Sequence, residues 1–193
     1  MSNTPFIVTS GKNLLESSSY LLNHIDDAEL TRNPNKLSFI LTVAAAFEAT
    51  INDAIVVWAH QRFPNSDYKR HATAFLSMNL MKKLDALGFL LSSGGFITDN
   101  ESKVYQSLSK LVKLRNEVAH SKDFFTDANI EFQEYENGDV TFDLPKEVVS
   151  KFSKSPLTTT KDSAFEIFEA VEHLFEVCNY DTEMSDSSLF KPL

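Results

Sequence analysis

Residues 33–62 read NPNKLSFILTVAAAFEATINDAIVVWAHQR, and this stretch decides the fold. It opens with Asn33 and Pro34, a strong helix start, because Asn is a favoured N-cap and Pro fits the first turn. The stretch predicts a helix from about Asn35 to Arg62, roughly 28 residues and ~42 Å long at 1.5 Å per residue. The rest of the chain has to pack along this helix.

One face of this helix is expected to be apolar, with a single acidic exception. Glu48 lies on that face, and a carboxylate that faces a core needs a cation or a hydrogen-bond donor. The small side chains of Ala44, Ala45 and Ala46 allow a neighbouring helix to approach closely. The apolar members of the face recur at helical spacing: Leu37, Leu41, Ala44, Ile51, Ile55 and Trp58.

A second predicted helix, ending near residue 122, also carries a charged residue on its apolar face, and this charge is positive. Its apolar stripe is interrupted by Arg115, which would be costly inside a core unless it were paired. Two misplaced charges of opposite sign predict a two-point ion pair between Glu48 and Arg115. If that pair is buried, removing one partner should cost roughly 3–5 kcal/mol. The alternatives are a rotated long helix with Glu48 solvated, and an Arg115 that reaches past the core to water.

The segment RNEVAH, residues 115–120, places an arginine, an asparagine and a histidine on the last turns of that helix. Asn116 and His120 are four residues apart and share one face. His120 is also open to a plainer interpretation, as an ordinary residue at a helix C-terminus, where a cation suits the helix dipole.

This segment, after a long Ala-rich helix that carries one Glu, resembles the HEPN superfamily, whose mark is Arg-x4–6-His with a polar residue after the Arg. The resemblance extends over roughly residues 10–122 and 160–178, and its specific part is 115–120. It implies an all-helical, usually dimeric bundle. In many members this is a metal-independent endoribonuclease of toxin or phage-defence type; other members only bind a protein partner or nucleotide.

The resemblance also implies roles for individual residues in RNA cleavage through the 2′-OH. His120 would act as general acid or base, and Arg115 would stabilise charge on the phosphate. Asn116 would orient His120 or a phosphate oxygen, and Glu48 would position Arg115 by pairing with its guanidinium. A homodimer would supply a second histidine. An antitoxin or another protein partner is a further expectation from the toxin setting.

Charge is distributed unevenly along the chain. The whole chain has a net charge of -9, which repels nucleic acid in general. Residues 101–122, in contrast, hold five basic and two acidic side chains, so an anionic ligand would be steered to this helix. Lys113 and Lys122 are therefore the candidates for contacts with RNA phosphates.

Composition predicts a soluble cytoplasmic protein without a cofactor. A hydrophobic content of 42% and sixteen Phe in 193 residues suit one globular domain, and five Gly and six Pro favour helices. The single cysteine, Cys178, excludes an internal disulfide and indicates a reducing compartment. Glu48, Asn52 and Asp53 interrupt the apolar stretch 37–60, which argues against a membrane span. No HExxH, CxxC or GxGxxG pattern occurs, so we expect no metal and no bound nucleotide cofactor.

A β-hairpin is predicted near 129–144, where apolar residues alternate on both sides of Glu136-Asn137-Gly138. A three-residue loop aligns Phe132 with Phe142 and Ile130 with Leu144. A lone hairpin is marginal in water, so it should pack on the helices or on a second subunit.

The predicted fold is therefore mainly all-α, an up-and-down bundle of four to five helices with one small hairpin. Residues 1–180 would form a single HEPN-like domain, and the acidic, Ser-rich tail 181–193 would be loose, although Leu189 and Phe190 have the means to dock. Thr98 to Glu101 has the form of a capping box. Besides the long helix, the expected segments are helices 10–29, 77–91, 101–122 and 160–178, with a connector at 63–77 that has room for a short helical turn.

Overall fold

The computed structural model describes residues 10–27, 34–63, 67–119, 132–134, 140–142, 144–152, 155–179 and 183–193. Within these ranges the chain is mainly helical, as predicted, with small antiparallel sheets. The helices are α1 (Gly11–Asn23), α2 (Pro34–Arg62), α3 (Asp67–Leu76), α4 (Leu80–Leu91), α5 (Lys103–Ala119), α6 (Lys146–Phe152) and α7 (Lys161–Asn179). The strands are β1 (Phe96–Thr98), β2 (Phe132–Glu134), β3 (Val140–Phe142) and β4 (Phe190–Pro192), and two 3-10 turns are η1 (Pro156–Thr158) and η2 (Met184–Asp186).

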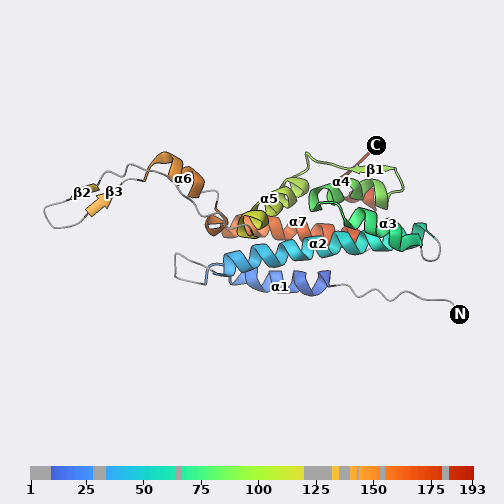
Figure 1. The fold of residues 1–193 in the computed structure, drawn as a ribbon, viewed down its shortest axis with the longest axis horizontal. Coiled ribbons are helices and arrows are strands. Elements are labelled where there is room, and N and C mark those ends of the chain that lie inside the picture. Colours follow the sequence, from blue (N-terminus) through green and yellow to red (C-terminus); the bar gives the residue numbers. More distant parts are fainter. Residues whose placement is uncertain are drawn as a thin grey trace.

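The long helix α2 is the centre of the bundle (Figure 1). It is in contact with α1 on one side and with α7, α5 and α4 on the other, while α3 folds back along its C-terminal end. Its start at Pro34 and its end at Arg62 confirm the predicted bounds. By length and composition alone α2 is long and apolar enough to cross a membrane, and half of its most apolar window is buried inside the protein, as in a core helix.

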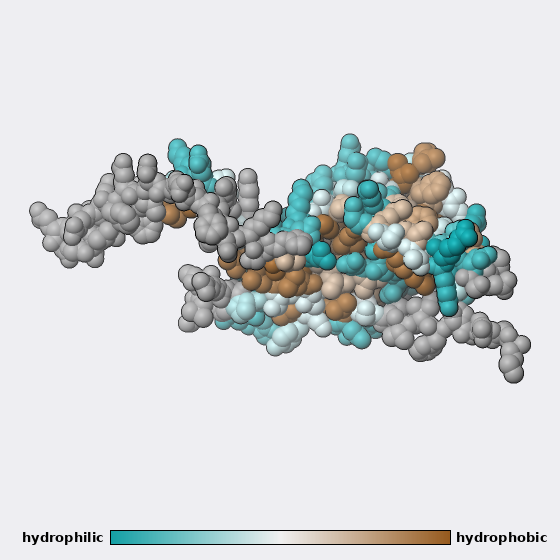
Figure 2. Space-filling model, in the orientation of Figure 1, coloured by the Kyte–Doolittle hydropathy of each residue, from teal (hydrophilic) through white to brown (hydrophobic). Residues whose placement is uncertain are grey.

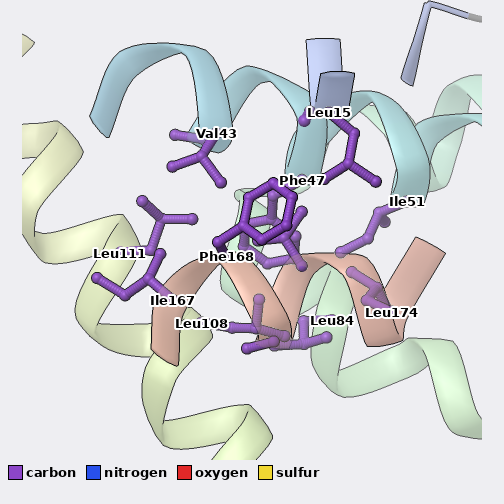
Figure 3. Packing of buried hydrophobic residues seen from close by; sticks show 14 of the residues in the cluster. Leu15, Val43, Phe47, Ile51, Leu84, Leu108, Leu111, Ile167, Phe168 and Leu174 are labelled. Atoms are coloured by element: carbon purple, nitrogen blue, oxygen red, sulfur yellow. The ribbon is translucent and has the colours of Figure 1, made fainter. Parts of the chain in front are cut away.

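The core lies where α2, α4, α5 and α7 converge (Figure 3). Because α2 has neighbours on several sides, its buried face is broad, as expected for a helix inside a bundle. The largest fully buried side chains of these four helices are Phe39, Ile40, Phe47, Ile51 and Ile55 of α2, Leu84 and Leu87 of α4, Leu108 and Leu111 of α5, and Ile167 and Leu174 of α7.

The predicted inward face of α2 is wrong in its centre. Phe39, Val43 and Phe47 are fully buried, whereas Leu41 is 43% exposed and Glu48 is half-exposed. The reason is that apolar residues continue around most of α2, so spacing alone could not tell which of them face the other helices. Leu41 and Glu48 lie at the border between the core and the solvent, whereas Ala44, Ile51 and Ile55 of the predicted face are buried, as predicted.

Two local assignments from sequence are also wrong. The predicted connector at 63–77 contains the ten-residue helix α3, which packs on α2. The capping box at Thr98 is not formed, because Thr98 ends strand β1 and its hydroxyl donates to the Leu84 carbonyl at 2.7 Å. Helix α5 is capped instead by Ser102, whose hydroxyl accepts the Tyr105 N–H at 3.1 Å.

The hairpin has the predicted register, with Phe132 opposite Phe142. Its turn and the predicted pairing of Ile130 with Leu144 lie outside the described residues. Figure 1 shows β2, β3 and α6 beyond the end of the bundle rather than on its helices. Packing of the hairpin on a second subunit stays a prediction.

The expectation of a loose tail is wrong for residues 183–193, which we call the C-terminal strap. Its strand β4 pairs antiparallel with β1, and Leu189 and Phe190 are buried in the core cluster. Lys191 Nζ also donates to Asp99 Oδ1 at 2.8 Å. Docking thus comes from two apolar side chains, a short ladder and one ion pair acting together.

Candidate functional site

The packing of α5 on α2 brings Arg115 to Glu48. The guanidinium Nη2 lies 3.7 Å from Glu48 Oε2, which confirms the predicted salt-bridge distance, but the predicted two-point contact is not formed because Glu48 Oε1 faces Lys83 instead. The two side chains are 43% and 41% exposed, so the pair stands at the border of the core and not inside it. Leu111 and Leu114 are the buried neighbours on α5, and Arg115 follows them at the edge of the buried face.

Asn116 is part of the same arrangement. Arg115 Nη1 donates to Asn116 Oδ1 at 3.1 Å. Three of the predicted site residues, Glu48, Arg115 and Asn116, therefore form one connected cluster. The asparagine amide oxygen holds one arm of the guanidinium while the Glu48 carboxylate holds the other.

Glu48 and Arg115 of this cluster form the polar wall of an open hollow of about 400 Å³ between α2 and the end of α5. Within the alanine run, Ala44 and Ala46 are buried against neighbouring helices, whereas Ala45 is exposed and borders the hollow. Figure 2 shows largely apolar surface over the N-terminal half of α2, beside the end of α5. The hollow is lined by Leu41, Ala44, Ala45, Glu48, Arg115 and Ala119.

The remaining predicted site residues, Lys113, His120 and Lys122, belong to α5 or come directly after it in the sequence. Lys113 is exposed on α5. His120 and Lys122 lie outside the described residues, but His120 follows Ala119, a lining residue of the hollow, directly in the sequence.

Sequence reasoning missed two residues that join the cluster. Lys83 of α4 is 4% exposed, and its Nζ lies 3.9 Å from Glu48 Oε1 and donates to Asn52 Oδ1 at 2.9 Å. Asn52 had been counted only as a polar interruption of the apolar stretch. Lys83 gives a faint signal in the sequence, because it directly precedes Leu84 on a strongly apolar helix.

The chemistry available at this site is anion recognition. Glu48 faces two cations, one on each carboxylate oxygen, so the three groups together carry an excess of one positive charge. Arg115 has N–H donors beyond the one given to Asn116, and its partial exposure leaves it accessible to a phosphate. Among the described residues, no group of three or more His, Cys, Asp or Glu is placed to hold a metal ion.

Comparisons of the chain with protein-family models, curated proteins and solved structures found no match. The resemblance at residues 115–120 and the geometry around Arg115 are thus the basis for a functional interpretation.

Proposed function

We propose that this protein is a HEPN-like, metal-independent endoribonuclease of the toxin or phage-defence type that acts in the cytoplasm. One observation carries the proposal: a partly exposed arginine held by Glu48 and Asn116 at the edge of a hollow, five positions before His120. An arginine fixed on two sides and open on the third is suited to a planar, two-point contact with a phosphate.

The proposed reaction uses the RNA itself as nucleophile. His120 takes the proton from the 2′-OH, the O2′–P bond forms and the P–O5′ bond breaks, leaving a 2′,3′-cyclic phosphate and a free 5′-OH. Arg115 stabilises the negative charge that builds up on the phosphate in the transition state. Lys113 and Lys122 contact neighbouring phosphates and orient the strand.

The 5′-oxygen also needs a proton as it leaves, and each chain supplies a single His120. We therefore include a homodimer in the proposal, with the two motifs facing each other across a two-fold axis. The apolar border of the hollow, with Leu41 and Ala45 exposed, is the surface that such a contact would cover. A cognate antitoxin would then inhibit by occupying this cleft.

The experiment is incubation of the purified protein with total RNA in excess EDTA. The expected result is cleavage that leaves 2′,3′-cyclic phosphate ends and spares DNA, which lacks the 2′-OH. His120→Ala should reduce the rate roughly 10²–10⁴-fold, the usual contribution of a positioned acid or base. Arg115→Lys should also lower the rate, because an ammonium group cannot make the same two-point contact.

Cleavage that depends on a metal, or cleavage of DNA, would contradict this mechanism. Complete inactivity on varied RNA would favour a second function, a non-catalytic HEPN-like dimer that binds a protein partner or a nucleotide. The net charge of -9 is the observation that favours this second function, since it opposes broad contact with RNA.

A further inference from the structure

Lys83 is the one charged residue among the described residues that is buried. Only 4% of its surface is exposed, although it lies on α4 between the apolar contacts of the core. A buried ammonium loses its hydration, and a hydrophobic side chain of similar volume would often be at least as favourable at such a position. Apolar packing alone therefore does not explain a lysine at this position. The explanation must come from its polar contacts.

The Lys83 ammonium contacts two residues of α2 at the candidate site. Lys83 Nζ donates to Asn52 Oδ1 at 2.9 Å and lies 3.9 Å from Glu48 Oε1. Asn52 and Glu48 are four residues apart, on the same face of α2. The other oxygen of Glu48 is the one that holds Arg115, at 3.7 Å.

We propose that Lys83 and Asn52 are positioning residues that hold the Glu48 carboxylate so that its second oxygen orients the Arg115 guanidinium. The inference rests on the proposed function, for which Arg115 is the phosphate-binding group. Without Lys83, a half-exposed glutamate on a helix would exchange between rotamers and between water and Arg115. With it, one carboxylate oxygen is anchored in the core and the other faces the site.

The arrangement also indicates the charge of the ligand. Two cations and one carboxylate leave a single positive charge, which a phosphodiester with one negative charge would balance. A phosphomonoester, which is close to doubly charged at pH 7, would exceed it. Internal positions of a nucleic-acid strand thus suit the site better than terminal phosphates.

The kinetic test compares Lys83→Met with Lys82→Met, the adjacent exposed lysine as matched control. Lys83→Met should lower kcat on RNA roughly 10- to 100-fold with KM within about twofold, because a misplaced Arg115 fails mainly in the transition state. In a Glu48→Gln background the same change should have little further effect, since the link already runs through Glu48. Additive losses, or an equal effect of Lys82→Met, would overturn the proposal.

A second readout does not depend on cleavage. The side-chain Nε–H signal of Arg115 in a ¹⁵N NMR spectrum, assigned with Arg115→Lys, should be sharp in the native protein, broadened in Lys83→Met and unchanged in Lys82→Met. If Lys83→Met does not fold, Asn52→Leu removes the other half of the anchor and should broaden the same signal. An unchanged Arg115 signal in the folded variant overturns the positioning role.

The two proposals fail in distinguishable ways. If the native protein cleaves no RNA while the Arg115 signal still responds to Lys83, the nuclease proposal fails and the positioning role stands. If RNA is cleaved while neither kcat nor the Arg115 signal responds to Lys83, the positioning role fails and the nuclease proposal stands.

Discussion

Glu48 and Arg115 meet at the border of the core, and this placement changes the energy expected from their ion pair. A buried pair would cost roughly 3–5 kcal/mol to break. With each side chain about two-fifths exposed, water screens the charges and compensates the loss. The pair therefore mainly orients the Arg115 guanidinium and contributes little to the free energy of unfolding.

We therefore expect Glu48→Gln to lower the free energy of unfolding by about 0.5–1 kcal/mol, the range of partly exposed ion pairs. Urea unfolding followed by circular dichroism measures this, with Glu169→Gln on the exposed face of α7 as control. A loss of several kcal/mol would mean that Glu48 mainly compensates the buried ammonium of Lys83, and no loss at all would mean that neither ion pair of Glu48 contributes in solution.

Cys178 gives a second prediction for a single residue. Burial raises the pKa of its thiol to about 12, so almost no thiolate exists at pH 8. Because the thiolate is the reactive form, DTNB should modify native Cys178 far more slowly than the same residue in urea. Equal rates in the two conditions would show that the Cys178 thiol is accessible to the reagent in the native protein.

At the scale of elements, the contact of α4 with β1 depends on Gly88. A Cβ added there would lie 2.7 Å from the backbone of Ile97 and Thr98 and 2.9 Å from the Phe190 ring. Gly88→Ala should therefore destabilise the protein by roughly 1–3 kcal/mol, although alanine is the better helix former. Gly95→Ala is the matched control, because its Cβ would meet Ser92 only at 3.7 Å. The measurement is the thermal unfolding midpoint of both variants.

The attachment of the C-terminal strap should weaken in acid. The hydrogen bond from Lys191, followed by that from the Glu101 backbone N–H, lowers the pKa of Asp99. A lowered carboxyl pKa contributes stability above the ordinary value of about 4, and this contribution is lost as the pH falls through the lowered pKa. The protection factor of the Leu193 amide against hydrogen exchange, corrected for the intrinsic rate at each pH, should then fall at low pH, because this amide bonds to Gly95 O.

Asp99→Asn provides the control for this strap. The variant should show a reduced protection factor at Leu193 already at pH 7 and little further reduction in acid. If its pH dependence equals that of the native protein, groups other than Asp99 govern the strap.

For the whole molecule, the proposed dimer gives the clearest prediction. Ala45 is exposed at the border of the hollow, so Ala45→Glu should produce a folded monomer by introducing a charge into the contact. Val57→Glu, at a 40% exposed position nearer the other end of α2, should leave the dimer intact. Light scattering at micromolar concentration measures both. A native monomer would contradict the composite site.

The sequence by itself determined the features that depend on local signals. The start of α2 follows from Asn33 and Pro34, and the register of Phe132 with Phe142 follows from alternation about Gly138. The pairing of Glu48 with Arg115 was also predictable, because two unlike charges interrupted two apolar helices.

Only the tertiary structure decided which side of α2 is buried, what anchors Glu48 and where the strap docks. Lys83 and Asn52 are thirty-one positions apart, and the paired residues Thr98 and Phe190 are farther still. No local periodicity encodes such contacts. The contact of Lys83 with Asn52 arises from the packing of α4 on α2. The docking of the strap arises from the packing of α4 on β1, where the absence of a side chain at Gly88 and the burial of Phe190 act together. The reason is that burial is a property of the assembled helices, whereas spacing is a property of each helix alone.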